Sequence, residues 1–144
     1  MMDYAIHDVF TDIALKGNSL AVVFDADHLD DRAMAAIAGE SNLSETVFVL
    51  KPENPVHSAW IPIFTTTREL PFAGHPTVGS AVALAERKRD DLPVEGSDMI
   101  HVIEEATGPV RCAAVLRRPS RRWHCGIFQL DKVWHPVYTP LRSV

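Results

Sequence analysis

Residues 69–81 read ELPFAGHPTVGSA, in which a glycine and a histidine stand directly before a proline. Proline suits the first position of a helix, because its missing N–H would have no intrahelical partner there. The residues that follow are apolar on most sides of a helix, and many of them are small. The stretch therefore predicts a helix over residues 76–88 that other elements enclose on several sides.

Segments of strand character lie on both sides of this helix in the sequence. β-branched and aromatic residues favour strands over residues 4–10, 19–24, 46–50, 60–66, 99–104, 110–116 and 123–130. Pro62 lies inside one of them and predicts an edge strand or a bulge, because proline cannot donate to a sheet. A short amphipathic helix is expected over residues 31–39, with an aspartate as N-cap and Gly39 near its end. This pattern predicts an α+β domain.

The composition narrows the classes of partner. The chain has 144 residues, of which 47% are hydrophobic, and this fits one globular domain. Its net charge of -5 argues against a nucleic-acid partner, because nucleic-acid binders carry a concentrated basic surface. No window of about 18 apolar residues is present, and the N-terminal residues lack the pattern of a secretory signal. We therefore expect a cytoplasmic protein with neither nucleic acid nor membrane as partner.

The sequence lacks the usual metal and cofactor motifs. Its two cysteines, Cys112 and Cys125, are too few for a thiol metal cluster, and its histidines lack metal-ligand spacing. We expect both cysteines to be small buried residues of strands, in a reducing compartment. Glycine-rich phosphate-binding motifs and the acyl-transfer motif GxSxG are also missing. The sequence therefore predicts no metal and no cofactor.

The first candidate for chemistry is Glu45, in the stretch NLSETVFV of residues 42–49. In a strand, Glu45 shares one face with Val47 and Val49, and the other face is apolar as well. Partial desolvation at the mouth of such a strand would raise the pKa of the carboxyl group, which suits a general acid/base. The alternative is a capping box of Asn42 and Glu45, but it needs a helix where the residues favour a strand. We favour the acid/base role.

The second candidate is the tripeptide Gly74-His75-Pro76. Glycine permits a close backbone approach, the residue before proline is biased towards extended backbone, and the helix N-terminus would present free N–H groups of Thr77 and Val78 to an anion. The positive end of the helix would favour a neutral His75. The alternative is a strand-to-helix turn with an incidental histidine, and the tripeptide alone favours that alternative.

Three segments together are more specific than either candidate. GNSLAV at residues 17–22, NLSETVFV at residues 42–49, and residues 63–81 with their GHPTVGSA ending resemble, in order and spacing, the phenazine-biosynthesis PhzF-like family of the diaminopimelate-epimerase-like superfamily. The resemblance extends from about residue 3 to about residue 132. It implies a diaminopimelate-epimerase-like half, a curved and mostly antiparallel sheet or barrel around the central helix at about 76–88, with one short outer helix at about 31–39.

The resemblance also implies an activity and its residues. It implies a cofactor-independent isomerase that removes and returns a proton at carbon of a small anionic metabolite. Glu45 would be the acid/base, and Gly74 and His75 would lie beside it in the substrate cleft, next to the anion-binding backbone of Thr77 and Val78. Related racemases use a pair of cysteines, whereas Ala73, Gly74 and His75 stand at this place, and this disfavours chemistry with two thiols.

The resemblance covers only the N-terminal half of the family's usual length. Residues 1–132 correspond to the N-terminal domain, and residues 133–144 are expected to be a tail or a truncated interdomain linker. The cleft would then be completed in a homo-oligomer or by a separately encoded second half. Two alternatives stay open: a non-catalytic remnant or small-anion-binding module of the same fold, and a truncated product of a longer reading frame.

Overall fold

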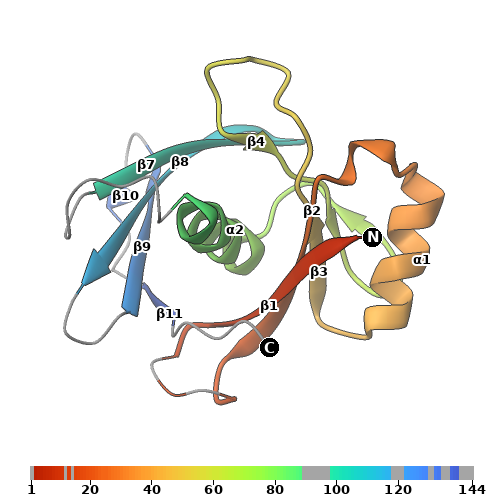
Figure 1. Cartoon of the computed structure of the whole chain (residues 1–144), viewed down its shortest axis with the longest axis horizontal. Helices are drawn as coiled ribbons and strands as arrows, with labels where there is room; N and C mark the ends of the chain where they lie inside the picture. The colour runs from red at the N-terminus through yellow and green to blue at the C-terminus, as the bar shows by residue number, and fades with distance from the viewer. Residues whose placement is uncertain are drawn as a thin grey trace.

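Two curved sheets surround one central helix in the computed structural model, which describes residues 2–11, 13, 15–88, 98–117, 122–129, 132–133 and 137–139 (Figure 1). The central helix is α2, Gly74–Arg87, and a second helix, α1, Asp31–Ser41, packs on the outside. This arrangement confirms the predicted α+β fold with an enclosed helix and a short outer helix.

The first sheet has the strand order β1-β2-β3-β5-β6. The bounds of its strands are Asp3–Val9 (β1), Asn18–Phe24 (β2), Glu45–Phe48 (β3), Ile63–Phe64 (β5) and Glu69–Leu70 (β6). Neighbouring strands are antiparallel except β2 and β3, which run parallel with Leu20 opposite Glu45. Because these two strands run in the same direction, their first residues lie close together at the same end of the two strands.

The crossover between β2 and β3 contains the 3-10 helix η1, Ala26–His28, and α1. The Asp30 carboxylate accepts a 2.8 Å hydrogen bond from the Ala33 N–H, which confirms an aspartate N-cap. The helix ends at Ser41 and not at Gly39, because Asn42 takes the left-handed conformation with φ 52° that closes it. Its apolar face covers the outer face of the sheet, in a cluster that contains Met34, Ala38, Val23, Phe48 and Phe64.

The second sheet has the strand order β10-β9-β8-β7-β4. Its strands are Ala59–Trp60 (β4), Asp98–Glu105 (β7), Gly108–Arg117 (β8), Arg122–Gln129 (β9) and Lys132–Val133 (β10). A further strand, β11, Val137–Thr139, pairs with β9. These three residues thus form a strand inside the segment that we expect to be a tail or a truncated interdomain linker, and valine, tyrosine and threonine favour a strand where a partner is available.

The predicted strand over residues 60–66 is two short strands that belong to different sheets. β4 pairs with β7 in the second sheet, whereas β5 pairs with β3 in the first. Pro62 lies between them, and its carbonyl accepts a 3.2 Å hydrogen bond from the Phe48 N–H. Because Pro62 has no N–H of its own, the chain leaves one ladder here and enters the other without an unpaired donor.

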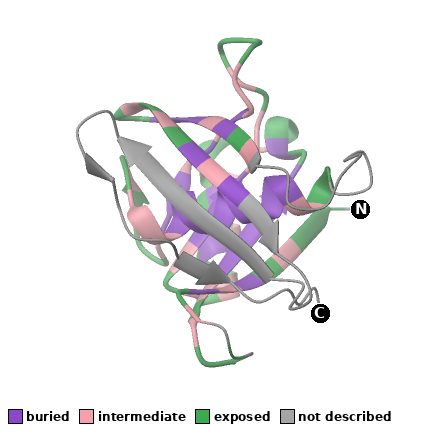
Figure 2. Ribbon diagram, turned by 90° about the vertical axis from the view of Figure 1, so that its left-hand side faces the viewer, coloured by how far each residue is buried: buried purple, intermediate pink, exposed green. Residues whose placement is uncertain are grey.

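The central helix is buried along most of its length. Ten consecutive residues, from Pro76 to Ala85, are buried, and Figure 2 shows the same helix enclosed between the two sheets. A Cβ atom at Gly79 would overlap the side chain of Leu20, so only glycine permits this approach of α2 to β2. The small residues of the helix thus let both sheets approach it closely, as the sequence predicted.

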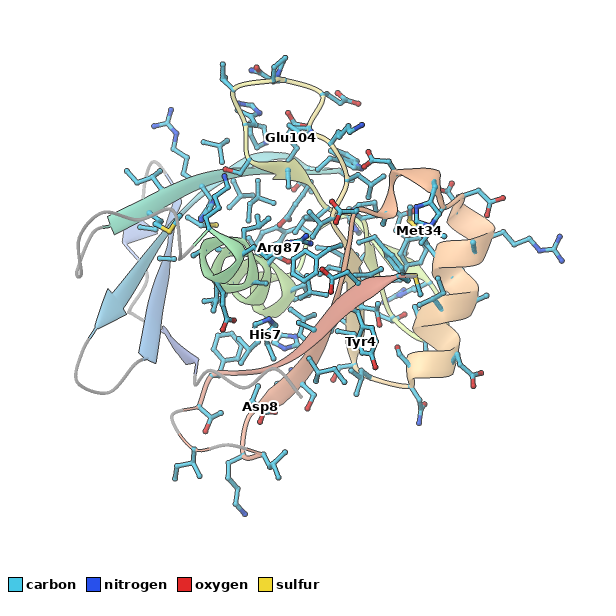
Figure 3. The ribbon with its side chains drawn as sticks, viewed as in Figure 1. Tyr4, His7, Asp8, Met34, Arg87 and Glu104 are labelled. Atoms are coloured by element: carbon cyan, nitrogen blue, oxygen red, sulfur yellow. The ribbon has the colours of Figure 1, made fainter. Side chains whose placement is uncertain are left out.

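The end of α2 away from His75 is anchored by Arg87, which is labelled in Figure 3. Its guanidinium lies 3.3 Å from the Asp3 carboxylate and 3.2 Å from that of Asp25, and it stacks over the Phe24 ring at 4.4 Å from the centroid. These contacts join the helix C-terminus to β1 and β2. Within the described residues, no helix is both long enough and apolar enough to cross a membrane.

Candidate active site

The three sequence segments of the resemblance meet at the N-terminus of α2. The parallel pairing of β2 and β3 brings Glu45, the first residue of β3, close to Asn18, the first residue of β2. Asn42 caps the end of α1 and no helix follows it, so the capping-box alternative for Glu45 is wrong. The fold therefore brings Glu45 and His75 to one point, although 30 residues separate them in sequence.

Glu45 and His75 form a hydrogen-bonded pair. The His75 Nδ1 atom lies 2.9 Å from Glu45 Oε2. The side chain of Glu45 is 19% exposed, whereas that of His75 is 9% exposed, so the carboxyl group is the part of the pair that a small molecule can reach more easily. Among the described residues, His75 is the only hydrogen-bond partner of the Glu45 side chain.

The second ring nitrogen of His75 decides where the protons of the pair can be. His75 Nε2 lies 2.9 Å from the backbone carbonyl oxygen of Asn18. A carbonyl only accepts, so Nε2 must carry a proton. The contact between Nδ1 and Glu45 Oε2 then contains one more proton, which belongs either to the imidazole or to the carboxyl group. The pair is therefore arranged to hold one transferable proton.

Two further side chains support this pair. Ser44 Oγ donates a 2.9 Å hydrogen bond to Asn18 Oδ1 and thereby joins the residue before Glu45 to the residue whose carbonyl binds His75. The ring of Phe10 lies 5.8 Å from the His75 ring, centroid to centroid, at an angle of 42°. Asn18, Ser44 and Phe10 were not among the predicted site residues. The first two stand in the quoted motifs, but a backbone carbonyl acceptor leaves no signal in a sequence.

The segment after β1 lies beside the site. Asp8 accepts a 2.5 Å hydrogen bond from the Leu15 N–H and one of 3.2 Å from Ser19 Oγ, so its carboxylate joins this segment to β2. Phe10, Ile13 and Leu15 are exposed. The rim of the site on this side is therefore apolar, with Phe10 next to His75.

The helix begins two residues earlier than we predicted. Its N-cap is Ala73 and its first residue is Gly74, so His75 is helical and not extended, and Pro76 is third. Proline fits there because the first N–H groups of a helix have no intrahelical partner. Thr77 donates its N–H to the Ala73 carbonyl at 3.2 Å, and its side chain and that of Val78 are buried. The free N–H groups therefore belong to Gly74 and His75, and not to Thr77 and Val78.

Gly74 is partly exposed and has open space beside its Cα atom. A Cβ atom built on Gly74 would meet no heavy atom within 4 Å. An anionic group can therefore approach the N–H groups of Gly74 and His75, which the helix dipole also favours. In the part of the chain that the structure describes, no group of three or more His, Cys, Asp or Glu side chains has the arrangement of a metal site.

The strand β7 positions two more glutamates that face opposite sides. Glu104 accepts hydrogen bonds from the N–H groups of Glu53 at 2.7 Å and Asn54 at 2.9 Å, and it contacts His57 Nδ1 at 2.7 Å. Burial alone would raise the pKa of Glu104, but these hydrogen bonds hold it below its ordinary value. Figure 3 shows Glu104 at the base of the loop that contains these donors. This second Glu–His pair is structural.

Solved structures that resemble this chain include epimerases and PhzF-family proteins. A predicted epimerase from Pseudomonas aeruginosa matches with a TM-score of 0.74 and 34% identity, over 86% of this chain and 41% of that protein. A hydroxyproline epimerase from Agrobacterium vitis matches with a TM-score of 0.60 over 87% of this chain and 41% of its own, and its 15% identity shows the fold alone. The fold is therefore that of the epimerase class, as predicted.

Sequence comparison places the chain more narrowly. Residues 7–123 match the phenazine biosynthesis-like protein family, PhzC-PhzF, and the chain belongs to this family. It is 60% identical over 111 residues to an uncharacterized isomerase of Mesorhizobium japonicum, with 77% of this chain and 35% of the relative covered. It is 44% identical over 126 residues to a trans-2,3-dihydro-3-hydroxyanthranilate isomerase of Pseudomonas fluorescens, with 85% and 45% covered. The chain thus spans less than half the length of these relatives.

Proposed function

We propose that this chain provides the acid/base half of a cofactor-independent isomerase, which moves a proton between carbon atoms of a small carboxylated metabolite. The observation that supports the proposal is the Glu45–His75 pair, with a partly exposed carboxyl group on a single imidazole partner. Membership in a family whose relatives bear the name isomerase supports the same reaction class.

In this proposal Glu45 moves the proton and His75 holds Glu45. The carboxylate accepts the proton as the C–H bond breaks, and the electron pair stays on the substrate, delocalised into its unsaturated or carboxyl groups. Glu45 then returns the proton to carbon, so the reaction needs no external acid or oxidant. The imidazole keeps its Nε2–H on the Asn18 carbonyl and shares its Nδ1 contact with Glu45, which fixes the carboxyl group in both protonation states.

The substrate carboxylate would bind at the N-terminus of α2. The free N–H groups of Gly74 and His75 are donors at the positive end of the helix, and the space beside Gly74 is open. Thr77 and Val78 are buried behind them and would act by holding the first turn in place. The anion would then lie within one helical turn of the Glu45–His75 pair.

The proposal includes a second half of the cleft. The chain spans 45% of the Pseudomonas fluorescens relative, the carboxyl group of Glu45 is partly exposed, and the exposed ring of Phe10 lies next to His75. A second copy of this chain or a separately encoded domain would close this side and exclude water, as ligand sites between domains commonly require.

Proton exchange at carbon tests the proposal directly. The chain is incubated in deuterated water with trans-2,3-dihydro-3-hydroxyanthranilate, alone and together with the C-terminal remainder of the Pseudomonas fluorescens relative, and deuterium at carbon is followed by NMR. We expect incorporation with the completed cleft and a loss of about 100-fold or more in Glu45→Gln, which keeps the shape and removes the base. Equal incorporation by Glu45→Gln would exclude Glu45 as the acid/base.

A small-anion-binding module of the same fold is the second candidate, and the partial span of the relatives favours it. It predicts that the chain is a monomer in ultracentrifugation and that no added half produces exchange. A small carboxylate such as acetate or succinate would then still shift the amide signals of Gly74 and His75 in NMR. Exchange of deuterium into any carbon of the substrate would exclude this candidate.

A further inference from the structure

Beneath the N-terminus of α2 lies a buried carboxyl group that the proposed reaction does not use. Glu105, the last residue of β7, is 2% exposed. Its Oε1 atom lies 2.5 Å from Thr77 Oγ1, and its Oε2 atom has no hydrogen-bond partner among the residues that the structure describes. A buried carboxylate oxygen without a partner is costly, whereas the same oxygen in a neutral acid costs far less.

The hydroxyl group of Thr77 has two oxygen neighbours, but it can donate a hydrogen bond to only one of them. Thr77 Oγ1 also lies 2.7 Å from the carbonyl oxygen of Ala73, the N-cap residue. A hydroxyl has one proton and a carbonyl only accepts, so the contact with Ala73 uses the proton of Thr77. The contact with Glu105 then needs a proton from Glu105. A neutral Glu105 satisfies both contacts, and an ionised Glu105 would take the Thr77 proton away from Ala73.

Among the side chains that the structure describes, the elements around Glu105 provide no charged partner. Among the described residues of α2, His75 is the nearest titratable group to Thr77 in sequence, and both of its ring nitrogens are bound by Glu45 and Asn18. In β8, Gly108 lies opposite Glu105 and Arg111 is exposed. On β7 itself, Glu104 faces the loop, and the pKa of His101 is lowered to about 4 by burial and by Lys88, so it stays neutral. The β4 residues Ala59 and Trp60 carry no charge.

We infer that Glu105 is a positioning residue for His75: as a neutral acid it completes a hydrogen-bond chain through Thr77 to the Ala73 carbonyl and so fixes the first turn of α2, on which His75 meets Glu45. The role of His75 as the partner of an acid/base Glu45 rests on the proposed function. The hydrogen bonds among Glu105, Thr77 and Ala73 do not depend on it. Burial raises the pKa of Glu105 to about 7, so we expect the hydrogen bond from Glu105 to Thr77 to be lost as the pH rises through this value.

NMR titration of the full chain tests the inference without any substrate. We expect the amide signals of Gly74, His75 and Thr77 to show a step at the pKa of Glu105, about 7. The step disappears in Glu105→Gln, because the amide is permanently neutral and still donates to Thr77. It persists in Glu104→Gln, a matched change at the neighbouring residue that faces the other side. An unchanged step in Glu105→Gln would overturn the inference.

Thr77 provides a second, independent test. Thr77→Val keeps the shape of the side chain but removes its hydroxyl group. We expect this variant to lose the step in the amide signals and to show a shifted Nδ1 signal of His75. Thr77→Ser restores the hydroxyl group and both signals. An unshifted Nδ1 signal of His75 in Thr77→Val would show that the hydrogen bonds from Glu105 through Thr77 to Ala73 do not position His75.

Exchange activity with the completed cleft separates this inference from the proposed function. We expect the exchange rate of Glu105→Gln, divided by that of the parent, to rise several-fold between pH 6 and pH 8.5. Only the parent protein loses the hydrogen bond between Glu105 and Thr77 in this range, because glutamine does not ionise. A constant ratio would contradict the positioning role. Absence of exchange in every variant, with the NMR step removed by Glu105→Gln, would contradict the proposed function and leave the positioning of His75 intact.

Discussion

The chain contains two Glu–His pairs that differ in which member is buried. In the candidate site the imidazole of His75 is 9% exposed and the carboxyl group of Glu45 19%, whereas in the loop pair the values are reversed, 19% for His57 and 9% for Glu104. Glu104 also accepts two backbone N–H groups, whereas Glu45 has His75 alone. The three donors of Glu104 stabilise its ionised form, whereas the carboxyl group of Glu45 has one imidazole partner among the described residues and is the more exposed member of its pair.

The same comparison extends to Glu105, whose carboxyl group has one hydroxyl partner and no N–H donor. The three glutamates thus form a series in their hydrogen-bond partners among the described residues: two backbone N–H groups and an imidazole for Glu104, one imidazole for Glu45 and one hydroxyl group for Glu105. The donors, and not the residue type, decide whether a buried carboxyl group is structural, reactive or neutral. The following predictions test this series, from the largest expected effect to the smallest.

The largest effect concerns the stability of the chain against pH. The pKa of Glu105 is raised from 4.5 to about 7 in the folded chain, so the folded state binds this proton more tightly than the unfolded state. The stability from this proton is fully present below pH 4.5 and is lost as the pH rises through about 7. Relative to the parent, Glu105→Gln therefore gains roughly 3 kcal/mol of unfolding free energy between pH 4.5 and pH 8.5, measured by urea denaturation.

The buried histidines do not disturb this measurement. Burial lowers the pKa of His7 to about 4, with Asp8 partly opposing this, and burial and Lys88 lower that of His101 to about 4. Both histidines destabilise the chain as the pH falls below their unfolded value of 6.5, but they do so equally in parent and variant. Parallel stability curves for the two chains would contradict the neutral state of Glu105.

The second effect separates the two Glu–His pairs by activity. Glu45→Asp withdraws the carboxyl group by one methylene from His75, and we expect the exchange rate with the completed cleft to fall about 100-fold at unchanged melting temperature. The matched change Glu104→Asp should leave exchange unchanged and lower the melting temperature, because its backbone donors lose their acceptor. A large loss of exchange in Glu104→Asp would show that the loop pair also serves the reaction.

A smaller effect is expected from the imidazoles. His75→Gln keeps one hydrogen-bond donor beside Glu45 but cannot bind both Glu45 and the Asn18 carbonyl in the same geometry. We expect roughly a 10-fold loss of exchange, about 1.4 kcal/mol of transition-state stabilisation. His57→Gln, measured in the same assay, should exchange as fast as the parent. Equal rates for the two variants would remove the distinction between the pairs.

The smallest effect concerns Ser44, which holds Asn18 through its side chain. Ser44→Ala removes an exposed hydrogen bond worth about 1 kcal/mol or less, and we expect a loss of exchange of a few-fold. The control is Ser58→Ala, which removes the hydroxyl that contacts His101 at 3.2 Å on the other sheet. The position of the His75 ring signals in NMR shows whether Asn18 has moved, and unmoved signals would contradict the role of Ser44.

Local physical reasons predicted the enclosed helix and the place of Glu45 at a strand start, whereas the meeting of Glu45 with His75 was expected only from the family resemblance. Small residues along one segment indicate close packing wherever the partners lie, and a carboxylate before Thr-Val-Phe-Val lies at a strand start because those residues favour a strand. The start of α2 was predicted two residues late, because proline is tolerated throughout the first turn of a helix.

The rest of the site depends on contacts between distant segments. The Asn18 carbonyl reaches His75 across 57 residues, and only the parallel register of β2 and β3 brings it there. The crossing at Pro62 could not be predicted because an edge strand and a change of sheet look alike in sequence. Glu104 and Glu105 are adjacent glutamates at the end of the same strand, so their sequence positions look alike. Only the folded structure distinguishes their partners, which are His57 for Glu104 and Thr77 for Glu105.

The crossing at Pro62 also concerns how the chain unfolds. Residues on either side of it contribute a strand to each sheet, and α2 contacts strands of both. The chain on either side of Pro62 is therefore held in two ladders, the β3–β5 ladder and the β4–β7 ladder. We therefore expect the two sheets to unfold in one cooperative transition, in which the global stability of the chain, and not that of a local loop, protects the geometry of Glu45 and His75.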